Sequence, residues 1–424
     1  MSYVPIVIYA GLLQQQPVGE SLTLRGHLDV AGRKIISSTG DLILQPAATK
    51  ALRAESTGNA RGEYAVDLQQ ARSLDTQAAT GNHSVIGGGR ANIAAGLYST
   101  TTGGELGTLY NSYGTVVGGW SNYSSFHRAA IGGGYDNTVD AAGSAAIIGG
   151  GYTNSVANLC GTVGGGANNA VTGDYATISG GRVNDITANY STVGGGYDNN
   201  VTAIYGAIGG GRENNDSNLY GIISGGYGNS VTVAAEQMGA SIGGGASNLV
   251  TSNYGAISGG VGNSVSGSTA TASGYYAKAD KFGQQAAASG KIAALGDAQV
   301  SQFTLFNSTT DDTLTTLFLD GDSLVLVIPT DTTWAFEATI VARRTDTDNE
   351  SARYKSIGCI DNNAGTTALV DAVQKVGADI EDSTDWAKTI DADASNNSLR
   401  IQVLGEDNKT IYWVACVRLV EVTG

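Results

Sequence analysis

Apolar residues recur at a fixed interval through the middle of the chain, most of them just before a short glycine-rich step. Successive members of this anchor column are 15 residues apart, except for one interval of 17 and one of 19. The additional residues leave the register of the repeat intact, which predicts loops on a stack of equal coils. The anchors are Ile86, Thr101, Val116, Ile131, Ile148, Val163, Ile178, Val193, Ile208, Ile223, Ile242, Ile257 and Ala272.

Three further columns keep the same register. An Asn stands six residues after nearly every anchor, a Tyr stands twelve after it in many repeats, and a β-branched residue is common eight after it. Asn amides can bond one another from coil to coil, and aligned Tyr rings can stack. We therefore expect structural ladders, with a sugar-binding strip as the alternative for the Tyr column. The expected ladder residues are Asn169, Asn184, Asn199 and Asn214, and Tyr175, Tyr190, Tyr205 and Tyr220.

A 15-residue unit is too short for a strand, a helix and both connections, whereas two short strands and two turns fit. The glycines permit positive φ and close backbone approach at one corner, and we expect the Asn to take the left-handed conformation at the other. Stacked coils of this kind form a parallel β-solenoid, so the predicted fold class is all-β. Strings similar to GxGxxG arise by chance in such repeats, and no strand–turn–helix context supports nucleotide binding.

The two ends of the chain have a different texture from the repeat. Residues 1–81 carry short alternating runs and much of the basic charge, which suits an attachment region or a solvated cap on the solenoid. Residues 82–297 form the predicted shaft. Residues 298–424 hold alternating strand candidates separated by acidic turns, which predicts a C-terminal β-sandwich of jelly-roll-like type.

Composition narrows the possible partners. The net charge of −15 argues against nucleic acid, whose phosphates would be repelled. The three Cys and three His are scattered, so we expect no disulfide framework, metal site or cofactor. The N-terminus has no basic segment and no small-residue cleavage site, and no apolar run is long enough to span a membrane. Synthesis in a cytoplasm, without membrane insertion, is the expectation.

Few residues suggest chemistry. Asp185 and Asp198 could approach each other on adjacent coils, but solvated turn charges explain them more simply than a carboxylate pair for hydrolysis. In the C-terminal region, Asp346 and Asp348 lie in a string that superficially resembles a Ca²⁺ loop without the EF-hand spacing. Trp386 stands in a polar, loop-like context where an aromatic ring could stack on a sugar. These three residues are the candidate ligand contacts, and no catalytic residue is expected.

The repeat also carries a resemblance. The cassette YSTVGGGYDNNVT, from Tyr190 to Thr202, resembles the left-handed parallel β-roll repeats of trimeric adhesin heads and bacteriophage tail fibres. Two further steps at Ala272 and Ala288 extend the similarity over roughly residues 82–297. The string GDLILQP near the N-terminus resembles attachment ends of phage fibres, and the stretch from Asp331 to Tyr354 resembles their distal domains. Members of these families are homotrimers, so the resemblance implies a homotrimer here.

The resulting expectation is a non-enzymatic, homotrimeric phage tail fibre on the virion. The N-terminal region would dock to a tail or baseplate protein, and the C-terminal domain would contact a host surface glycan or outer-membrane component. A thin roll buries little surface alone, which also favours packing of several copies. The alternatives are a head fibre or capsid decoration protein, a trimeric cell-surface adhesin, and a polysaccharide depolymerase tailspike.

Overall fold

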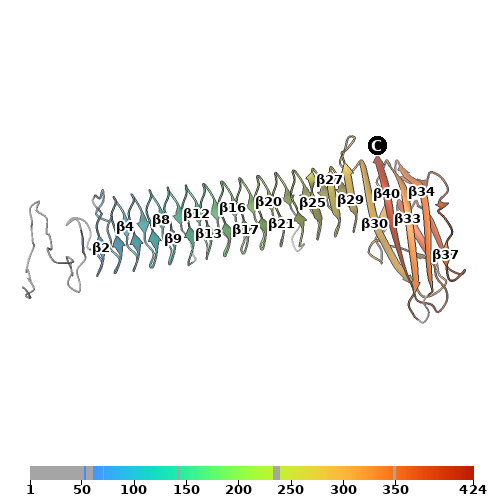
Figure 1. Cartoon of the computed structure of the whole chain (residues 1–424), viewed down its shortest axis with the longest axis horizontal. Helices are drawn as coiled ribbons and strands as arrows, with labels where there is room; N and C mark the ends of the chain where they lie inside the picture. The colour runs from blue at the N-terminus through green and yellow to red at the C-terminus, as the bar shows by residue number, and fades with distance from the viewer. Residues whose placement is uncertain (1–51, 54–60, 70, 141–143, 233–238, 347–349) are drawn as a thin grey trace, which may run out of the picture. The chain divides into compact units, whose positions relative to one another are not determined.

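The computed structural model describes residues 52–53, 61–69, 71–140, 144–232, 239–346 and 350–424. Within those ranges every regular element is a β-strand, so the prediction of an all-β fold is confirmed. A parallel solenoid leads into antiparallel sheets toward the C-terminus (Figure 1). The expected attachment region lies largely outside the described residues.

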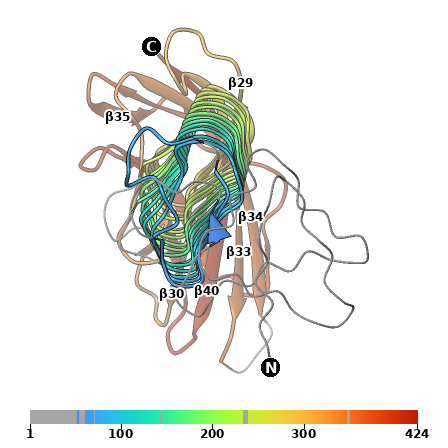
Figure 2. The same cartoon turned by 90° about the vertical axis from the view of Figure 1, so that its left-hand side faces the viewer.

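From β3 to β28, each coil of the solenoid contributes one short strand to each of two parallel sheets, and Figure 2 shows the coils superimposed in an end-on view. We call the sheet that contains the anchors the anchor sheet. Its strands in the solenoid are β1 (Leu52–Arg53), β2 (Val66–Asp67), β3 (Val85–Ile86), β5 (Thr100–Thr101), β7 (Thr115–Val116), β9 (Ala130–Ile131), β11 (Ile147–Ile148), β13 (Thr162–Val163), β15 (Thr177–Ile178), β17 (Thr192–Val193), β19 (Ala207–Ile208), β21 (Ile222–Ile223), β23 (Ser241–Ile242), β25 (Ala256–Val261), β27 (Thr271–Tyr275) and β29 (Gln285–Ser289).

The other sheet of the solenoid, which we call the second sheet, holds the residues that follow each Asn of the repeat. Its strands are β4 (Ile93–Ala94), β6 (Thr108–Leu109), β8 (Tyr123–Ser124), β10 (Thr138–Val139), β12 (Ser155–Val156), β14 (Ala170–Val171), β16 (Asp185–Ile186), β18 (Asn200–Val201), β20 (Asn215–Asp216), β22 (Ser230–Val231), β24 (Leu249–Val250), β26 (Ser264–Val265) and β28 (Lys278–Ala279).

The repeat register read from the sequence is the pairing register of the strands. Val193 lies beside Ile208 in parallel pairing, one coil of 15 residues away. The longer intervals preserve this pairing, because Ile131 still lies beside Ile148, and Ile223 still lies beside Ile242. The register of the repeat is therefore kept across both longer intervals, as predicted.

The solenoid core is a double row of β-branched side chains. The anchors and the residues eight positions after them point inward and are almost fully buried, as for Val193 and Val201. Because successive residues of a strand point to opposite faces, the first residue of each two-residue strand points outward. A few inward positions are polar, such as Thr101 and Ser124, and at one of them Asp216 replaces the usual Val or Ile.

The corners differ in part from the expectation. Gly196 has a φ of +95°, and a Cβ there would lie 2.0 Å from the carbonyl oxygen of Gly211 on the next coil, so glycine is required. The left-handed residue at the next corner is Asp198, with a φ of 56°, and not Asn199. The prediction that the Asn column is left-handed is therefore wrong. The Asn is needed one residue later, immediately before the strand, where its amide points into the coil.

The C-terminal region is a β-sandwich. Its larger sheet orders four long strands as β30 (Ala298–Thr309), β40 (Ile411–Thr423), β33 (Thr332–Arg344) and β34 (Ser351–Asn363). Three short strands pair with β34, namely β35 (Thr366–Leu369), β36 (Gln374–Lys375) and β37 (Ile380–Glu381). The smaller sheet contains β31 (Thr315–Thr316), β32 (Leu326–Val327), β38 (Ala387–Asp393) and β39 (Ser398–Leu404).

The sandwich has an aromatic core and a direct main-chain link to the solenoid. Trp334 and Trp413 of the larger sheet are fully buried and belong to the same cluster as Ile401 of the smaller sheet. Strand β29, in the last coil, pairs antiparallel with β30, which places Ala287 opposite Val300. The anchor sheet therefore continues from the solenoid into the larger sheet of the sandwich.

Candidate binding surfaces

The Asn column lies inside the solenoid. The side-chain nitrogen of Asn199 donates to Oδ1 of Asn184 at 3.0 Å and to the carbonyl oxygens of Gly195 and Gly211 at 3.0 Å each. Its backbone nitrogen donates to the same Oδ1 at 3.0 Å. Asn169, Asn184 and Asn214 repeat this pattern and are equally buried. These amides are occupied in holding one coil to the next, and they present nothing to a ligand.

The Tyr column lies on the surface. Ring centroids are 5.2 Å apart for Tyr175 and Tyr190, 5.3 Å for Tyr190 and Tyr205, and 5.0 Å for Tyr205 and Tyr220. The four side chains are about half exposed. Stacking covers both faces of Tyr190 and Tyr205, so solvent reaches their edges and hydroxyl groups. A sugar stacks on the open face of an aromatic ring, and the inner rings offer no such face.

A second surface column stands four residues after each anchor from Ile86 to Ile257. The ring centroids of Trp120 and Tyr135 are 4.5 Å apart. Farther along, the guanidinium carbons of Arg182 and Arg212 lie 5.8 Å and 5.5 Å from the ring centroid of Tyr197. Isolated bridges connect this position from coil to coil. The signal was a constant offset occupied by different residue types, which a search for identical residues overlooks.

The structure contradicts the expectation that Trp386 is an exposed ring on which a sugar could stack. Its side chain is only 2% exposed, and its ring lies edge-on to Trp413 with the centroids 5.7 Å apart. The residue immediately precedes β38 and belongs to the sandwich core. A buried ring has no face for a sugar, so the prediction of an exposed stacking platform is wrong. The polar neighbours that suggested a loop are exposed residues beside an inward-pointing one.

The acidic segment around Asp346 is neutralised by basic groups of the chain. Arg344 forms an ion pair with Asp346 and places Nη1 3.1 Å from Oε2 of Glu350. Lys409 lies 3.0 Å from Glu350 and 2.6 Å from Glu406, and its hydrogen bond lowers the pKa of Glu406. Asp348 lies outside the described residues. The described ranges contain no group of three or more His, Cys, Asp or Glu side chains placed to hold a metal ion.

The isolated acids of the solenoid occupy different environments. Asp185 lies in β16, opposite Asn200, and partial burial raises the pKa of its carboxyl group. Asp198 is an exposed turn residue in the left-handed conformation. The two carboxyl groups therefore occupy different parts of the coil, one in a strand of the second sheet and the other at a turn.

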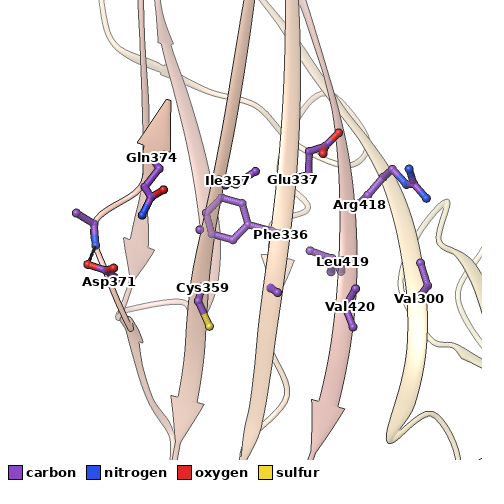
Figure 3. Close-up of a pocket in the computed structure, with 13 residues that line it drawn as sticks. Val300, Phe336, Glu337, Ile357, Cys359, Asp371, Gln374, Arg418, Leu419 and Val420 are labelled. Atoms are coloured by element: carbon purple, nitrogen blue, oxygen red, sulfur yellow. Dashed lines mark hydrogen bonds between the residues drawn. The ribbon is translucent and has the colours of Figure 1, made fainter. Parts of the chain in front are cut away.

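The sandwich carries a hollow of about 560 Å³ over strands β30, β40, β33 and β34. Figure 3 shows Glu337 and Arg418 on neighbouring strands, with Asp371 and Gln374 across the hollow. Val300, Phe336, Ile357, Leu419 and Val420 supply apolar lining. Glu337 also pairs with Lys355 at 3.0 Å.

A cysteine thiol lies near the charged groups of this hollow. Cys416 lies in β40 near Arg418 and Glu337, and burial raises the pKa of its thiol, which disfavours the nucleophilic thiolate. A hollow with an apolar floor and charged groups at its rim is suited to contact with the surface of another molecule.

No helix in the described part of the chain is long and apolar enough to cross a membrane.

The geometry therefore defines a parallel β-solenoid joined to an antiparallel sandwich. No protein-family model matches the chain, and no curated protein matches it. Among solved structures, the chain is similar to the Acinetobacter baumannii phage AM24 tailspike protein, with 9% identity, a TM-score of 0.24, and coverage of 88% of this chain and 77% of that one.

Two further structures are similar to the chain. The tailspike protein of Acinetobacter phage vB_ApiP_P1 shows 9% identity, a TM-score of 0.21, and coverage of 89% and 79% of the two chains. The tailspike protein gp49 of Acinetobacter baumannii bacteriophage Fri1, described as a capsular polysaccharide depolymerase, shows 8% identity, a TM-score of 0.21, and coverage of 84% and 66%.

Proposed function

We propose that the chain is a non-enzymatic fibre protein of a bacteriophage particle and acts as a homotrimer. Residues 1–81 dock to a tail or baseplate protein, residues 82–297 form a stiff spacer, and residues 298–424 form the tip that contacts the host. The partner at the tip is a surface glycan or an outer-membrane component. The fibre belongs to the virion and is made in the cytoplasm of the infected host.

One observation carries this proposal, and it is the unbroken main-chain pairing from the solenoid to the sandwich. Parallel strands connect every described coil to the next, and β29 passes the pairing on to β30. The Asn ladder adds side-chain bonds between coils in the interior. A stack held in this way resists bending, which is the property that a spacer between two functional ends needs.

The proposal that the particle is a bacteriophage rests on the sequence resemblance to phage fibre repeats. In a homotrimer, three copies of the tip would approach the host together. Linked sites raise the effective concentration of each other, so that three weak contacts hold far better than one. A rigid spacer favours this effect because it keeps the three tips in a fixed arrangement.

The full-length protein tests the proposal directly. Light scattering is expected to give about three times the chain mass of 43.1 kDa, and labelled protein is expected to bind host cells and slow adsorption of the phage. A mass of 43.1 kDa would refute the homotrimer. Release of reducing ends from capsule or lipopolysaccharide would replace the binding function by depolymerase activity.

A further inference from the structure

One face of the solenoid carries no charge. The residues just before and just after each anchor point outward from the anchor sheet, as do those on either side of Ala286, the inward residue of β29 that pairs with the anchor Ala272. From Val85 to Ala287 all of these positions lie within the described residues. They are Val85, Gly87, Thr100, Thr102, Thr115, Val117, Ala130, Gly132, Ile147, Gly149, Thr162, Gly164, Thr177, Ser179, Thr192, Gly194, Ala207, Gly209, Ile222, Ser224, Ser241, Gly243, Ala256, Ser258, Thr271, Ser273, Gln285 and Ala287.

The charged residues of the solenoid lie on its other surfaces. Asp140 and Lys278 point outward from the second sheet. Arg182, Arg212 and Glu213 lie at the corner between the two sheets. In a chain with a net charge of −15, the described residues of the solenoid therefore place no charged side chain on this broad face.

This face continues into the sandwich. Residues opposite each other in an antiparallel pair share a face of the sheet. Ala287 lies opposite Val300, Val300 opposite Val420, Val420 opposite Ala335, and Ala335 opposite Cys359. The outward side of the anchor sheet is thus one continuous surface from the solenoid across the larger sheet. We call it the continuous outer face.

Its C-terminal part exposes many apolar side chains to solvent, with the charged Glu337, Lys355 and Arg418 among them. Val420 is 57% exposed, although the opposite side of the same strand is buried in the sandwich core. Large exposed apolar patches mark contact surfaces in soluble proteins. The hollow of Figure 3 opens on this part. The exposed apolar residues of the four long strands are Val300, Phe306, Val341, Ile357, Tyr412, Val414, Val420 and Val422.

We propose that other copies of this chain cover the continuous outer face, in an assembly whose rotation axis runs parallel to the solenoid. The proposal rests on the proposed homotrimer and assigns its interface. Rotation about such an axis places each coil beside the same coil of its neighbours. A charge near the axis would meet its own copies and be repelled, so the charge-free solenoid part of this face suits contact with itself. The hollow of Figure 3 then belongs to the subunit interface.

The face is also long enough. At a strand spacing of about 4.8 Å, the strands from β3 to β29 give a strip about 60 Å long. Stable interfaces bury about 800 Å² on each partner. A strip of that length needs to be only about 13 Å wide to reach this area, before the apolar surface of the sandwich is added.

Charge introduced on this face tests the assignment. We compare the double variant Thr192→Lys/Ile222→Lys with the control Thr172→Lys/Thr202→Lys, whose positions are exposed on the second sheet and have the same spacing. Light scattering of the full-length protein is expected to give the single-chain mass of 43.1 kDa for the first variant and the wild-type mass for the control. Circular dichroism checks that both retain strand structure.

Cross-linking gives a second measurement that does not depend on disrupting the assembly. In a background with Cys160, Cys359 and Cys416 changed to Ser, Thr192→Cys is expected to give covalent dimers and trimers with bi- and trivalent maleimides. Thr202→Cys is expected to give monomers only.

The outcomes separate the two proposals. A wild-type protein of single-chain mass would overturn both the homotrimer and its interface. A trimer that survives the anchor-sheet substitutions but dissociates with the control pair, or that cross-links through Thr202→Cys, would overturn the interface alone. Loss of binding to host cells by an intact trimeric Thr192→Lys/Ile222→Lys variant would show that the continuous outer face binds the receptor, which also overturns the interface.

Discussion

At the scale of single residues, the solenoid carries the buried acid Asp216 at a position where its repeat usually has an apolar side chain. Asp216 is fully buried in the row that contains Val201 and Val231. Its Oδ1 accepts a hydrogen bond from the backbone nitrogen of Asn218 at 3.1 Å. Burial raises the pKa of this carboxyl group to about 6, because removal from water disfavours the charged form.

This carboxyl group predicts a pH dependence of stability. Its folded pKa lies above the ordinary value of 3.8, so its contribution is fully present below about pH 4 and is lost as the pH rises through about 6. A shift of this size corresponds to about 3 kcal/mol. We expect Asp216→Asn, which keeps an acceptor, to raise the midpoint of denaturant unfolding at pH 7.5 and to have little effect at pH 4. The exposed turn variant Asp198→Asn is the control, and an equal gain at both pH values would contradict the expectation.

The Asn ladder gives a second prediction at this scale. Asn199→Ala removes the side-chain nitrogen that donates to three oxygen atoms. It also removes the Oδ1 that accepts hydrogen bonds from the backbone and side-chain nitrogens of Asn214, at 3.2 and 3.0 Å. Each unsatisfied buried group costs about 1–3 kcal/mol. We expect a loss of at least about 3 kcal/mol of unfolding free energy, measured by chemical denaturation. Thr202→Ala, at an exposed position, should change it by less than about 0.5 kcal/mol.

At the scale of elements, the coil was predictable and its corners were not. Glycine and β-branched spacing gave the period, the two strands and the inward rows, because these depend on the repeat alone. The left-handed corner was assigned one residue late, to Asn199 and not Asp198, because Asn is favoured both in that conformation and as a buried hydrogen-bonding group. Trp386 was misplaced because alternation near the end of a strand can bury an aromatic ring between polar neighbours.

The Tyr ladder combines stacking with backbone strain, and the two can be separated. Tyr205 has a φ of 61° and stacks between Tyr190 and Tyr220. Tyr205→Ala and Tyr205→Gly both remove the stacking, but only glycine relieves the left-handed conformation. We therefore expect the Gly variant to be more stable than the Ala variant by about 1 kcal/mol, as measured by thermal or denaturant unfolding. The opposite order would show that side-chain packing dominates at this corner.

The first described coils suggest an ionic cap. Asp67 takes the anchor position beside Ile86. Its Oδ2 lies 2.6 Å from Nε of Arg61 and 3.2 Å from Nη2 of Arg72, and all three side chains are almost fully buried. Removing one partner of a buried ion pair costs about 3–5 kcal/mol. We expect Asp67→Asn to increase amide hydrogen exchange in strands β2 and β3 and to leave exchange in β17 and β19 unchanged. Equal exchange throughout would show that the cap does not act locally.

At the scale of the whole molecule, the sequence predicted the kinds of domain better than the surfaces that they use. The texture of residues 298–424 indicated a sandwich, because alternation and acidic turns are local features. Continuity of the anchor sheet with the larger sheet of the sandwich depends on the register between β29 and β30, which no local pattern fixes. For the same reason, the hollow of Figure 3 joins residues from strands that are far apart in the chain.

Equal coils make the length of the solenoid adjustable, and this gives the last prediction. Deleting residues 194–208 joins Val193 to Gly209 and removes one complete coil, so every later residue keeps its place in the repeat. We expect the variant to fold with a nearly unchanged unfolding midpoint and to be shorter by about 4.8 Å. Deleting residues 194–205 removes three residues fewer and joins Val193 to Gly206, which misaligns the inward rows and the Asn ladder. That variant should unfold at much lower denaturant concentration or fail to fold, because its buried amides lose their partners. Equal stability of the two deletions would contradict a solenoid whose register is set by the 15-residue coil.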